Sequence, residues 1–332
     1  MNTAETNLNP AAAGLPTERE LLNLAAELLG EAPVAPVEAS GTDWAQIAAD
    51  VLREQSASAS SEAYSPTLVS AKKAADVPPS ASASAPPLPR SHATIGSVPV
   101  DKLRADFPRL QEPLSSGKPL VWFDNGATTQ RPQQVIDRIS YYYAHENSNV
   151  HRGAHELAAR STDAYENARS TVAKFLGAGN ANDIVFVRGT TEGINMVAQS
   201  YVRPILQPGD EIIVSLLEHH ANIVPWQMIA AATGAKLRVI PVDADGQLNL
   251  SEYTKLFNSH TRFVSVTHVS NVLGTVTPIA ELVAIAHAHG VRILIDGAQS
   301  VAHIPVNVTA LDPDFYVFSG HKVFGPNGLG AV

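Results

Sequence analysis

The 332-residue sequence contains no cysteine. The absence excludes disulfides, thiolate metal sites and a thiol nucleophile from the chemistry of this chain. Basic residues are also scarce, with 23 Lys and Arg against 32 Asp and Glu, and the net charge of −9 does not favour nucleic acid or an anionic membrane as a partner. No apolar run reaches the roughly 18 residues of a membrane-spanning helix, and the N-terminus has no signal-peptide pattern. We therefore expect a soluble, cytoplasmic protein.

Residues 1–97 have little of what a folded core needs. Ala, Ser and Pro dominate them, and they carry eleven acidic and five basic side chains. Because such a segment buries too little apolar surface to offset its ordering entropy, we predict a mostly disordered extension. Two short amphipathic helices are predicted within it, near residues 17–29 after a Thr17–Glu20 capping box and near residues 43–53 after Asp43. They are typical either of docking peptides that fold into a partner's groove or of helices that pack on their own domain.

Residues 98–332 have the pattern of an α/β domain. Apolar runs predict strands near residues 184–187, 211–215, 236–240, 263–267, 292–295 and 314–318, with helices near 191–201, 222–233, 251–257 and 279–289. This alternation predicts a mainly parallel sheet with helices on both faces. Before it, the sequence predicts helices at 101–107, 132–145 and 157–176, the last ending at Gly177, and a short strand at Leu120–Phe123.

A lysine directly follows the last predicted strand. Phe315–Phe318 is aromatic and β-branched, and Ser319-Gly320-His321-Lys322 and a Gly/Pro loop come after it. At a buried strand end the charged form of Lys322 is disfavoured, its pKa falls, and the neutral amine can attack a carbonyl to form a Schiff base. The alternative is a solvated lysine on a surface turn.

The preceding strand ends in a carboxylate, Asp296, which is followed by Gly297-Ala298-Gln299. Ligands of parallel α/β sheets bind at the carboxyl ends of the strands. An aspartate there, one strand before a Schiff-base lysine, is typical of a site for pyridoxal phosphate, which needs a carboxylate beside its pyridinium nitrogen. Asp296 can also be the N-cap of the following helix, and the two roles are compatible.

Three further motifs join these two in resembling a known family. They are Arg188–Asn195 (RGTTEGIN), Glu218–Trp226 (EHHANIVPW) and His268–Thr275 (HVSNVLGT). From about Val100 to Val332 the chain resembles the class V aminotransferase superfamily, and within it the SUF-system (group II) cysteine desulfurases, close to selenocysteine lyases. The resemblance implies the large domain of the fold type I pyridoxal-phosphate enzymes, with the small domain largely missing. We therefore expect a chain that is truncated at its C-terminus.

The resemblance also implies roles for the polar residues of these motifs. Lys322 would hold pyridoxal phosphate covalently and act in catalysis together with His219, which would stack on the pyridine ring. The other implied cofactor ligands are Asp296 at the ring nitrogen, Gln299 at the phenolic oxygen, Asn271, and the phosphate ligands Thr190, Thr191, Ser319 and His321. The implied substrate-binding residues are Asn271, His151 and Arg152.

Other interpretations are open at several of these positions. Thr190 and Thr191 are also ordinary N-cap residues, and Asn271 and the His151-Arg152 pair can be simple hydrogen-bonding groups of loops. The adjacent His219 and His220 can be a metal pair, but the sequence sets no carboxylate or thiolate partner beside them, and we expect no metal. A nucleotide-binding α/β protein is disfavoured because the sequence has neither a Walker A motif nor G-x-G-x-x-G.

The implied reaction converts L-cysteine to L-alanine and an enzyme persulfide, as a sulfur supply for Fe–S clusters or for storage. In the family, the nucleophilic cysteine and the carboxylate-binding arginine lie downstream of the lysine motif, so this chain alone is predicted to be inactive. The resemblance further implies a homodimer and a sulfur acceptor protein. The extension resembles those that load desulfurases into an encapsulin shell, and would place the protein in that compartment. The alternatives are a selenocysteine lyase or another class V enzyme, and a non-catalytic encapsulin cargo or interaction module.

Overall fold

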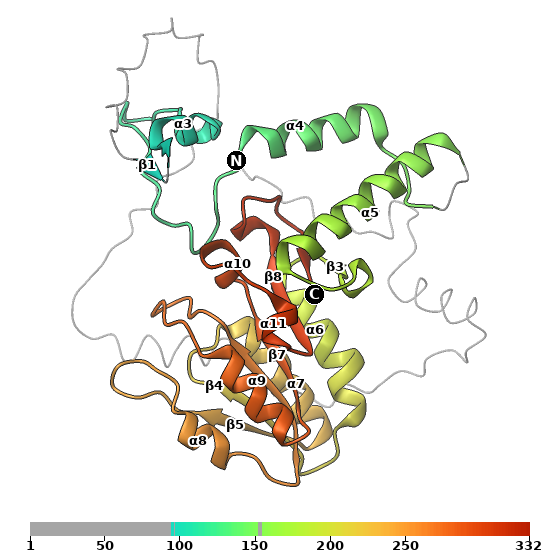
Figure 1. Cartoon of the computed structure of the whole chain (residues 1–332), viewed down its shortest axis with the longest axis vertical. Helices are drawn as coiled ribbons and strands as arrows, with labels where there is room; N and C mark the ends of the chain where they lie inside the picture. The colour runs from blue at the N-terminus through green and yellow to red at the C-terminus, as the bar shows by residue number, and fades with distance from the viewer. Residues whose placement is uncertain (1–93, 96, 152–154) are drawn as a thin grey trace, which may run out of the picture. The chain divides into compact units, whose positions relative to one another are not determined.

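The computed structural model describes residues 94–95, 97–151 and 155–332 (Figure 1). The two helices predicted near residues 17–29 and 43–53, and most of the predicted extension, lie outside the described residues. Of the two compact units into which the chain divides, only Ala81–Val332 contains described residues. This unit begins with a two-stranded antiparallel ribbon, β1 (Thr94–Ile95) and β2 (Val98–Pro99), followed by α3 (Val100–Ala105), close to the helix predicted at 101–107.

A seven-stranded sheet organises the rest of this unit, in the order β3-β9-β8-β7-β6-β4-β5. The strands are β3 (Phe186–Val187), β4 (Glu211–Ser215), β5 (Lys236–Ile240), β6 (Thr261–Thr267), β7 (Arg292–Asp296), β8 (Phe315–Ser319) and β9 (Gly330–Ala331). From β5 to β8 every neighbouring pair is parallel, whereas β9 runs antiparallel to both β8 and β3. The prediction of a mainly parallel α/β sheet is confirmed.

Two hydrophobic clusters cover the two faces of this sheet. Neighbouring strand residues point to opposite faces, so Ile212 packs in one cluster and Ile213 in the other, and both side chains are fully buried. One face packs against α6 (Thr190–Val197) and α7 (Val224–Thr233); the other packs against α5 (Glu156–Leu176), α8 (Leu250–Lys255), α9 (Ile279–Ala288) and α10 (Ser300–His303). Helices on both faces leave only the sheet's ends for a ligand.

The helix ends follow from the local sequence. The helix α5 ends at Gly177, whose φ of 66° is a left-handed conformation that glycine adopts without strain, as predicted. The predicted helix at 191–201 is α6 continued by a π-helical turn, Ala198–Val202. The predicted helix at 132–145 is α4 (Gln133–Tyr141), again continued by a π-helical turn. None of the helices formed by the described residues is long and apolar enough to cross a membrane.

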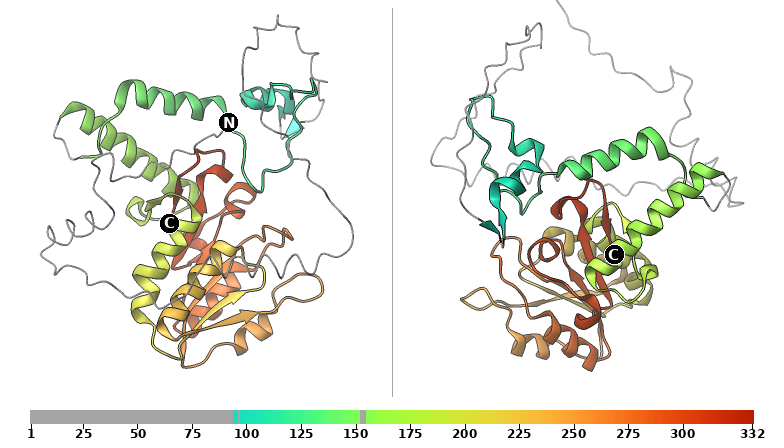
Figure 2. Two further views of the ribbon diagram at one scale, coloured as in Figure 1. Left: turned by 180° about the vertical axis from the view of Figure 1, so that it is seen from behind. Right: turned by 45° about the horizontal axis from the view of Figure 1, so that its top comes forward.

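The strand predicted at Leu120–Phe123 is wrong. These residues form no strand, and the segment that precedes α4 is irregular in all views (Figure 2). The side chains of Val121 and Phe123 alternate with that of Trp122 as they would on an edge strand, but they are 65% and 92% exposed. Trp122 instead donates through Nε1 to the carbonyl of Thr128, at 3.1 Å. The run of apolar residues suggested a strand, but none of the strands formed by the described residues pairs with it.

Candidate active site

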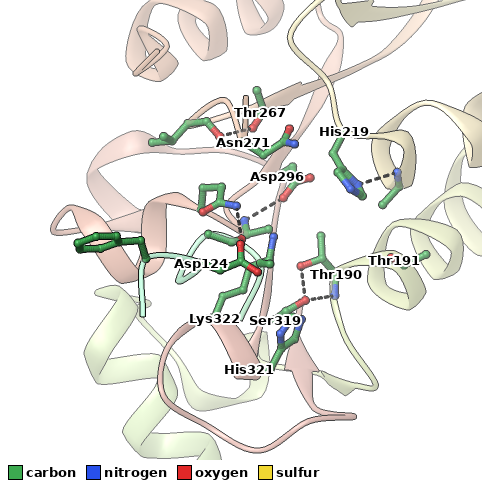
Figure 3. A pocket seen from close by; sticks show the side chains of 17 residues that line it. Asp124, Thr190, Thr191, His219, Thr267, Asn271, Asp296, Ser319, His321 and Lys322 are labelled. Atoms are coloured by element: carbon green, nitrogen blue, oxygen red, sulfur yellow. Dashed lines mark hydrogen bonds between the residues drawn. The ribbon is translucent and has the colours of Figure 1, made fainter. Parts of the chain in front are cut away.

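A cavity of about 600 Å³ lies where the parallel strands end (Figure 3). Each of β4, β6, β7 and β8 contributes residues from its carboxyl end or from the loop that follows, and the start of α6 closes one side. The cavity is lined by Phe123, Asp124, Gly126, Ala127, Thr190, Thr191, His219, Ala221, Thr267, Val269, Asn271, Asp296, Ala298, Gln299, Ser319, His321 and Lys322. The crossover topology therefore gathers residues that are up to about 200 positions apart in the sequence.

Lys322 lies in a short 3₁₀ turn, Gly320–Lys322, immediately after β8. The side chain is half-buried, and no group in the described part of the chain forms a hydrogen bond or ion pair with its Nζ. Burial lowers the pKa of Lys322, and the nearby charge of Asp296 opposes this shift only in part. A lowered pKa increases the fraction of Lys322 that is neutral, and a neutral amine without a hydrogen-bond partner can attack a carbonyl.

Asp296 is the last residue of β7, the strand next to β8, and is only 3% exposed. Its Oδ1 accepts a hydrogen bond from the backbone N–H of Ala298 at 2.8 Å, while no donor among the described residues reaches Oδ2. Burial raises the pKa of Asp296 to about 6, against the opposing effects of that hydrogen bond and of Lys322. The free oxygen of this dry carboxylate is suited to hold a protonated ring nitrogen.

The turn after Asp296 is packed against β8. The N–H of Gly297 donates to the carbonyl of Val317, and a Cβ at position 297 would lie 2.1 Å from the ring of Tyr316. The Tyr316 hydroxyl bonds in turn to the Ser300 hydroxyl at 2.6 Å and to Nδ1 of His268 at 2.9 Å. Only a glycine fits this close approach, so the turn that carries Asp296 is firmly held.

The start of α6 forms the anion-binding side of the cavity. Gly189, with φ 150°, is the N-cap, and the N–H of Thr190 donates to the Ser319 hydroxyl at 2.8 Å. The Thr190 hydroxyl is also 2.8 Å from that of Ser319, and Thr191 lines the cavity one residue further on. Hydroxyl donors at the positive end of a helix favour a phosphate group.

His321 and His219 line the same cavity. Burial, then the charges of Lys322 and Arg131, lower the pKa of His321. The pKa of His219 is lowered mainly by burial and further by the charges of Lys322 and His220. Nδ1 of His219 accepts a hydrogen bond from the N–H of Ala221 at 3.1 Å. A lowered pKa favours the neutral form of each imidazole ring.

The amide residues Gln299 and Asn271 also reach the cavity. Gln299 donates through Nε2 to the carbonyl of Gly126 at 2.7 Å, which ties the end of β7 to the irregular segment before α4. Asn271 is exposed in the loop closed by the Val269–Val276 bridge. Of the predicted substrate ligands, His151 is exposed and does not line this cavity, and Arg152 lies outside the described residues.

Sequence reasoning did not assign a role to Glu218, which lies buried beside His219. The carboxylate accepts hydrogen bonds from the Ser215 hydroxyl at 2.5 Å, Asn222 Nδ2 at 2.6 Å and the Thr267 N–H at 2.9 Å. Burial raises its pKa to about 8 despite these three donors. The position of Glu218 next to the histidine pair was the only available signal. Within the described residues, no three His, Cys, Asp or Glu side chains converge as a metal site.

The residues present fit pyridoxal phosphate. The amine of Lys322, which has no hydrogen-bond partner among the described residues, and the buried carboxylate of Asp296, which has one free oxygen, follow adjacent strands. Hydroxyl groups at the N-terminus of α6 line the same cavity. An α/β protein with this site at the carboxyl edge of its sheet falls in the class of pyridoxal-phosphate fold type I enzymes. The family model "Aminotransferase class-V" matches residues 121–332, and the chain belongs to that family.

Two similar proteins are both named cysteine desulfurase. A cysteine desulfurase of Synechococcus elongatus is 59% identical over 251 residues, which are 75% of this chain and 40% of that protein. One of Dickeya dadantii is 55% identical over 233 residues, 70% of this chain and 57% of that protein. This chain therefore spans roughly two fifths to three fifths of the length of these relatives.

Solved structures support the fold. The crystal structure of a cysteine desulfurase from Escherichia coli superposes with a TM-score of 0.61 and 42% identity, over 70% of this chain and 56% of that one. The apo structure of a cysteine desulfurase from Thermococcus onnurineus gives a TM-score of 0.64 and 39% identity, over 70% and 56% of the two chains. Both confirm the fold type I architecture expected from the sequence.

Proposed function

We propose that this chain carries the pyridoxal-phosphate-binding part of a cysteine desulfurase. The observation that carries the proposal is that Lys322 and Asp296 follow the ends of two adjacent parallel strands and line one cavity with the hydroxyl donors at the start of α6. The names of the similar proteins support L-cysteine as the substrate.

When bound, pyridoxal phosphate supplies an electron-accepting ring that stabilises negative charge on the α-carbon of an amino acid. Asp296 would hold a proton on the ring nitrogen, and His219 would pack against the ring. Lys322 would anchor the cofactor and, as a general base, would take the proton from the α-carbon of the substrate. The depressed pKa of Lys322 suits this last role, because a base must be unprotonated to accept a proton.

Other residues of the cavity orient the cofactor. Thr190, Thr191, Ser319 and His321 would bind its phosphate. Gln299 would donate to its phenolic oxygen through the second hydrogen of Nε2, because the first is donated to the carbonyl of Gly126. Asn271 contacts the cofactor and the substrate carboxylate, and His151 and Arg152 remain predicted substrate ligands. These assignments are supported by the shared cavity for all but His151 and Arg152.

The sulfur-accepting thiol is not part of this chain, which has no cysteine. We therefore propose that the chain by itself releases neither alanine nor sulfide from L-cysteine. A homodimer, a sulfur acceptor protein, a SUF-type role in Fe–S cluster supply and a cytoplasmic location are further proposals that rest on the resemblance. Turnover is checked by measuring alanine and sulfide with the purified chain, and repeated catalytic turnover would contradict the proposal.

The extension, residues 1–97, is proposed to dock into an encapsulin shell. Its Ala/Ser/Pro-rich composition with two separate amphipathic stretches supports a tethered docking peptide. A reporter protein fused to residues 1–97 should co-purify with a co-expressed shell protein. A reporter that stays outside the shell, while a known cargo enters it, would contradict this part of the proposal.

Covalent trapping tests the cofactor site itself. The chain is incubated with pyridoxal phosphate, reduced with borohydride and digested, and the modified peptide is identified by mass spectrometry. We expect the label on Lys322 and its loss in Lys322→Ala. Lys236→Ala, which changes an exposed lysine of β5, is the matched control and should label like the wild type. Labelling at other lysines with Lys322 unmodified would refute the proposal.

A further inference from the structure

The backbone carbonyl of His321, directly before Lys322, accepts an unusual number of hydrogen bonds. The N–H of Thr129 lies 2.9 Å from this oxygen and the Thr129 hydroxyl 3.0 Å. The hydroxyl of Thr128 and Nη1 of Arg131 each lie 3.3 Å from it. Four donors thus converge on one oxygen with two lone pairs, and all come from a segment about 190 residues earlier in the sequence.

The same segment also holds the backbone after Lys322. The Thr129 hydroxyl accepts a hydrogen bond from the N–H of Phe324 at 2.9 Å, and Nη2 of Arg131 donates to Asn327 Oδ1 at 2.6 Å. Phe324 has φ 64°, a left-handed conformation that is unfavourable for a bulky residue. An external contact is needed to keep the turn in this conformation, and Thr129, which is 5% exposed, provides it.

A further contact fixes this segment to the opposite wall of the cavity. The carbonyl of Gly126 accepts the hydrogen bond from Gln299, after β7, and the carbonyl of Thr128 accepts that from Trp122. Residues 126–131 therefore connect the end of β7 with the turn after β8. The position of Lys322 relative to Gln299 is set by this connection as well as by the sheet.

We propose that Thr129 and Arg131 are positioning residues for Lys322: they clamp the backbone on both sides of it and so hold its side chain toward the cavity. The inference rests on the proposed function of Lys322 as the cofactor anchor. A lysine side chain has four rotatable bonds, so the backbone at its base must be fixed for its amine to stay aligned. Neither residue touches the reacting atoms in this scheme.

Two variants test the clamp, each with a matched control. Thr129→Val removes the hydroxyl and keeps the shape, and Thr162→Val removes a hydroxyl that bonds only within α5. Arg131→Gln removes the guanidinium group that bonds to the His321 carbonyl and to Asn327. Its control, Arg138→Gln, removes an exposed arginine that pairs with Glu146. Two quantities are measured: backbone hydrogen exchange across residues 320–327 without cofactor, and the rate of borohydride-trapped labelling of Lys322 with pyridoxal phosphate.

We expect exchange across residues 320–327 to quicken at least about fivefold in Thr129→Val and in Arg131→Gln, because each loses bonds worth about 1 kcal/mol apiece. Labelling of Lys322 should slow by a similar factor, while both controls match the wild type. Unchanged exchange in the two variants would overturn the proposal, and so would slower labelling without faster exchange.

Two milder variants keep the test decisive if Thr129→Val does not fold. Thr129→Ser retains the hydroxyl and should behave like the wild type, whereas Asn327→Ala removes one bond to Arg131 and should quicken exchange by a smaller factor. Equal exchange in Asn327→Ala and the wild type would overturn the role of Arg131. If wild-type Lys322 is not labelled at all, the proposed function fails, and the exchange comparison still decides whether the clamp holds this turn.

Discussion

The cavity has two walls that are held in different ways. One wall consists of strand ends, Asp296 and Ser319, whose backbone positions are fixed by the ladders between β6, β7 and β8. The other is the irregular segment 120–131, which pairs with none of the strands formed by the described residues and is held by individual hydrogen bonds, most of which involve side chains. The first wall should tolerate little change in volume, and the second should depend on individual polar groups.

Two glycines, one in each wall, test this difference most directly. A Cβ at position 297 would lie 2.1 Å from the Tyr316 ring, while one at position 126 would lie 3.8 Å from the nearest atom of Gln299. We expect Gly297→Ala to lower the free energy of unfolding by at least about 3 kcal/mol, because the ring has no room to move. Gly126→Ala should change it by less than about 0.5 kcal/mol.

Urea denaturation of the chain without cofactor measures both values. Tyr316→Ala would create space for the added methyl group. Gly297→Ala should therefore lower the free energy of unfolding by less when it is combined with Tyr316→Ala. Equal effects of the two alanine substitutions, or no rescue by the smaller residue at position 316, would show that the two walls do not differ as described.

The strand-end wall could be predicted from the sequence, since its signals are local. The runs at Glu211–Ser215 and Lys236–Ile240 are the strands β4 and β5 with the predicted bounds, because short apolar stretches between turn residues allow little else. Once the strands alternate with helices, parallel order places Asp296 and Lys322 at one edge of the sheet. Their shared cavity follows from that topology.

The other wall could not be predicted in the same way. The strand predicted at Leu120–Phe123 was wrong, since a run of apolar residues is a local pattern but strand pairing is not. The bonds between Thr129 and the His321 carbonyl join positions about 190 residues apart, and no local pattern predicts them. Glu218 is likewise buried because β4 and β6 are neighbours in the sheet and end at the same edge, and no local sequence pattern predicts this contact.

A substitution of Asp296 tests the electrostatics of the strand-end wall. Asp296→Asn keeps Oδ1 as the acceptor for the Ala298 N–H but can no longer hold a protonated ring nitrogen. We expect affinity for pyridoxal phosphate to fall roughly thirtyfold, about 2 kcal/mol, the value of a charged hydrogen bond. Absorbance titration of the chain with the cofactor measures this change.

Stability without cofactor should change in the opposite direction. The pKa of Asp296 is about 6 in the folded chain and 3.8 in the reference state, so ionisation above pH 6 opposes folding. Removing the charge should raise the free energy of unfolding at pH 8, by up to about 3 kcal/mol. Asp163→Asn, in an exposed position of α5, is the control and should change neither quantity. A loss of both affinity and stability in Asp296→Asn would show that the carboxylate has a structural role instead.

The smallest expected effect concerns Glu218, buried between the ends of β4 and β6. Its pKa is raised from 4.5 to about 8 in the folded chain, so between these values the folded state binds a proton that the unfolded state has lost. Stability therefore falls as pH rises through this range. Between pH 7 and 8 we expect a loss of about 1 kcal/mol from Glu218 in the wild type, and none in Glu218→Gln.

The difference between the two proteins isolates this group, because neighbouring titrations act equally in both. Asp296, with a pKa of about 6, and His268, with a pKa lowered to about 4 by burial, have finished titrating in the folded chain by pH 7. Because the pKa of Lys322 is lowered in the folded chain, its contribution to stability rises with pH, which is opposite to the contribution of Glu218. This contribution is the same in both proteins and cancels in the comparison. Urea denaturation at pH 7 and 8 gives the difference, with Glu252→Gln, at a half-exposed position of α8, as the control. A wild-type slope retained in Glu218→Gln would mean that Glu218 is ionised in the folded chain and that its three donors outweigh its burial.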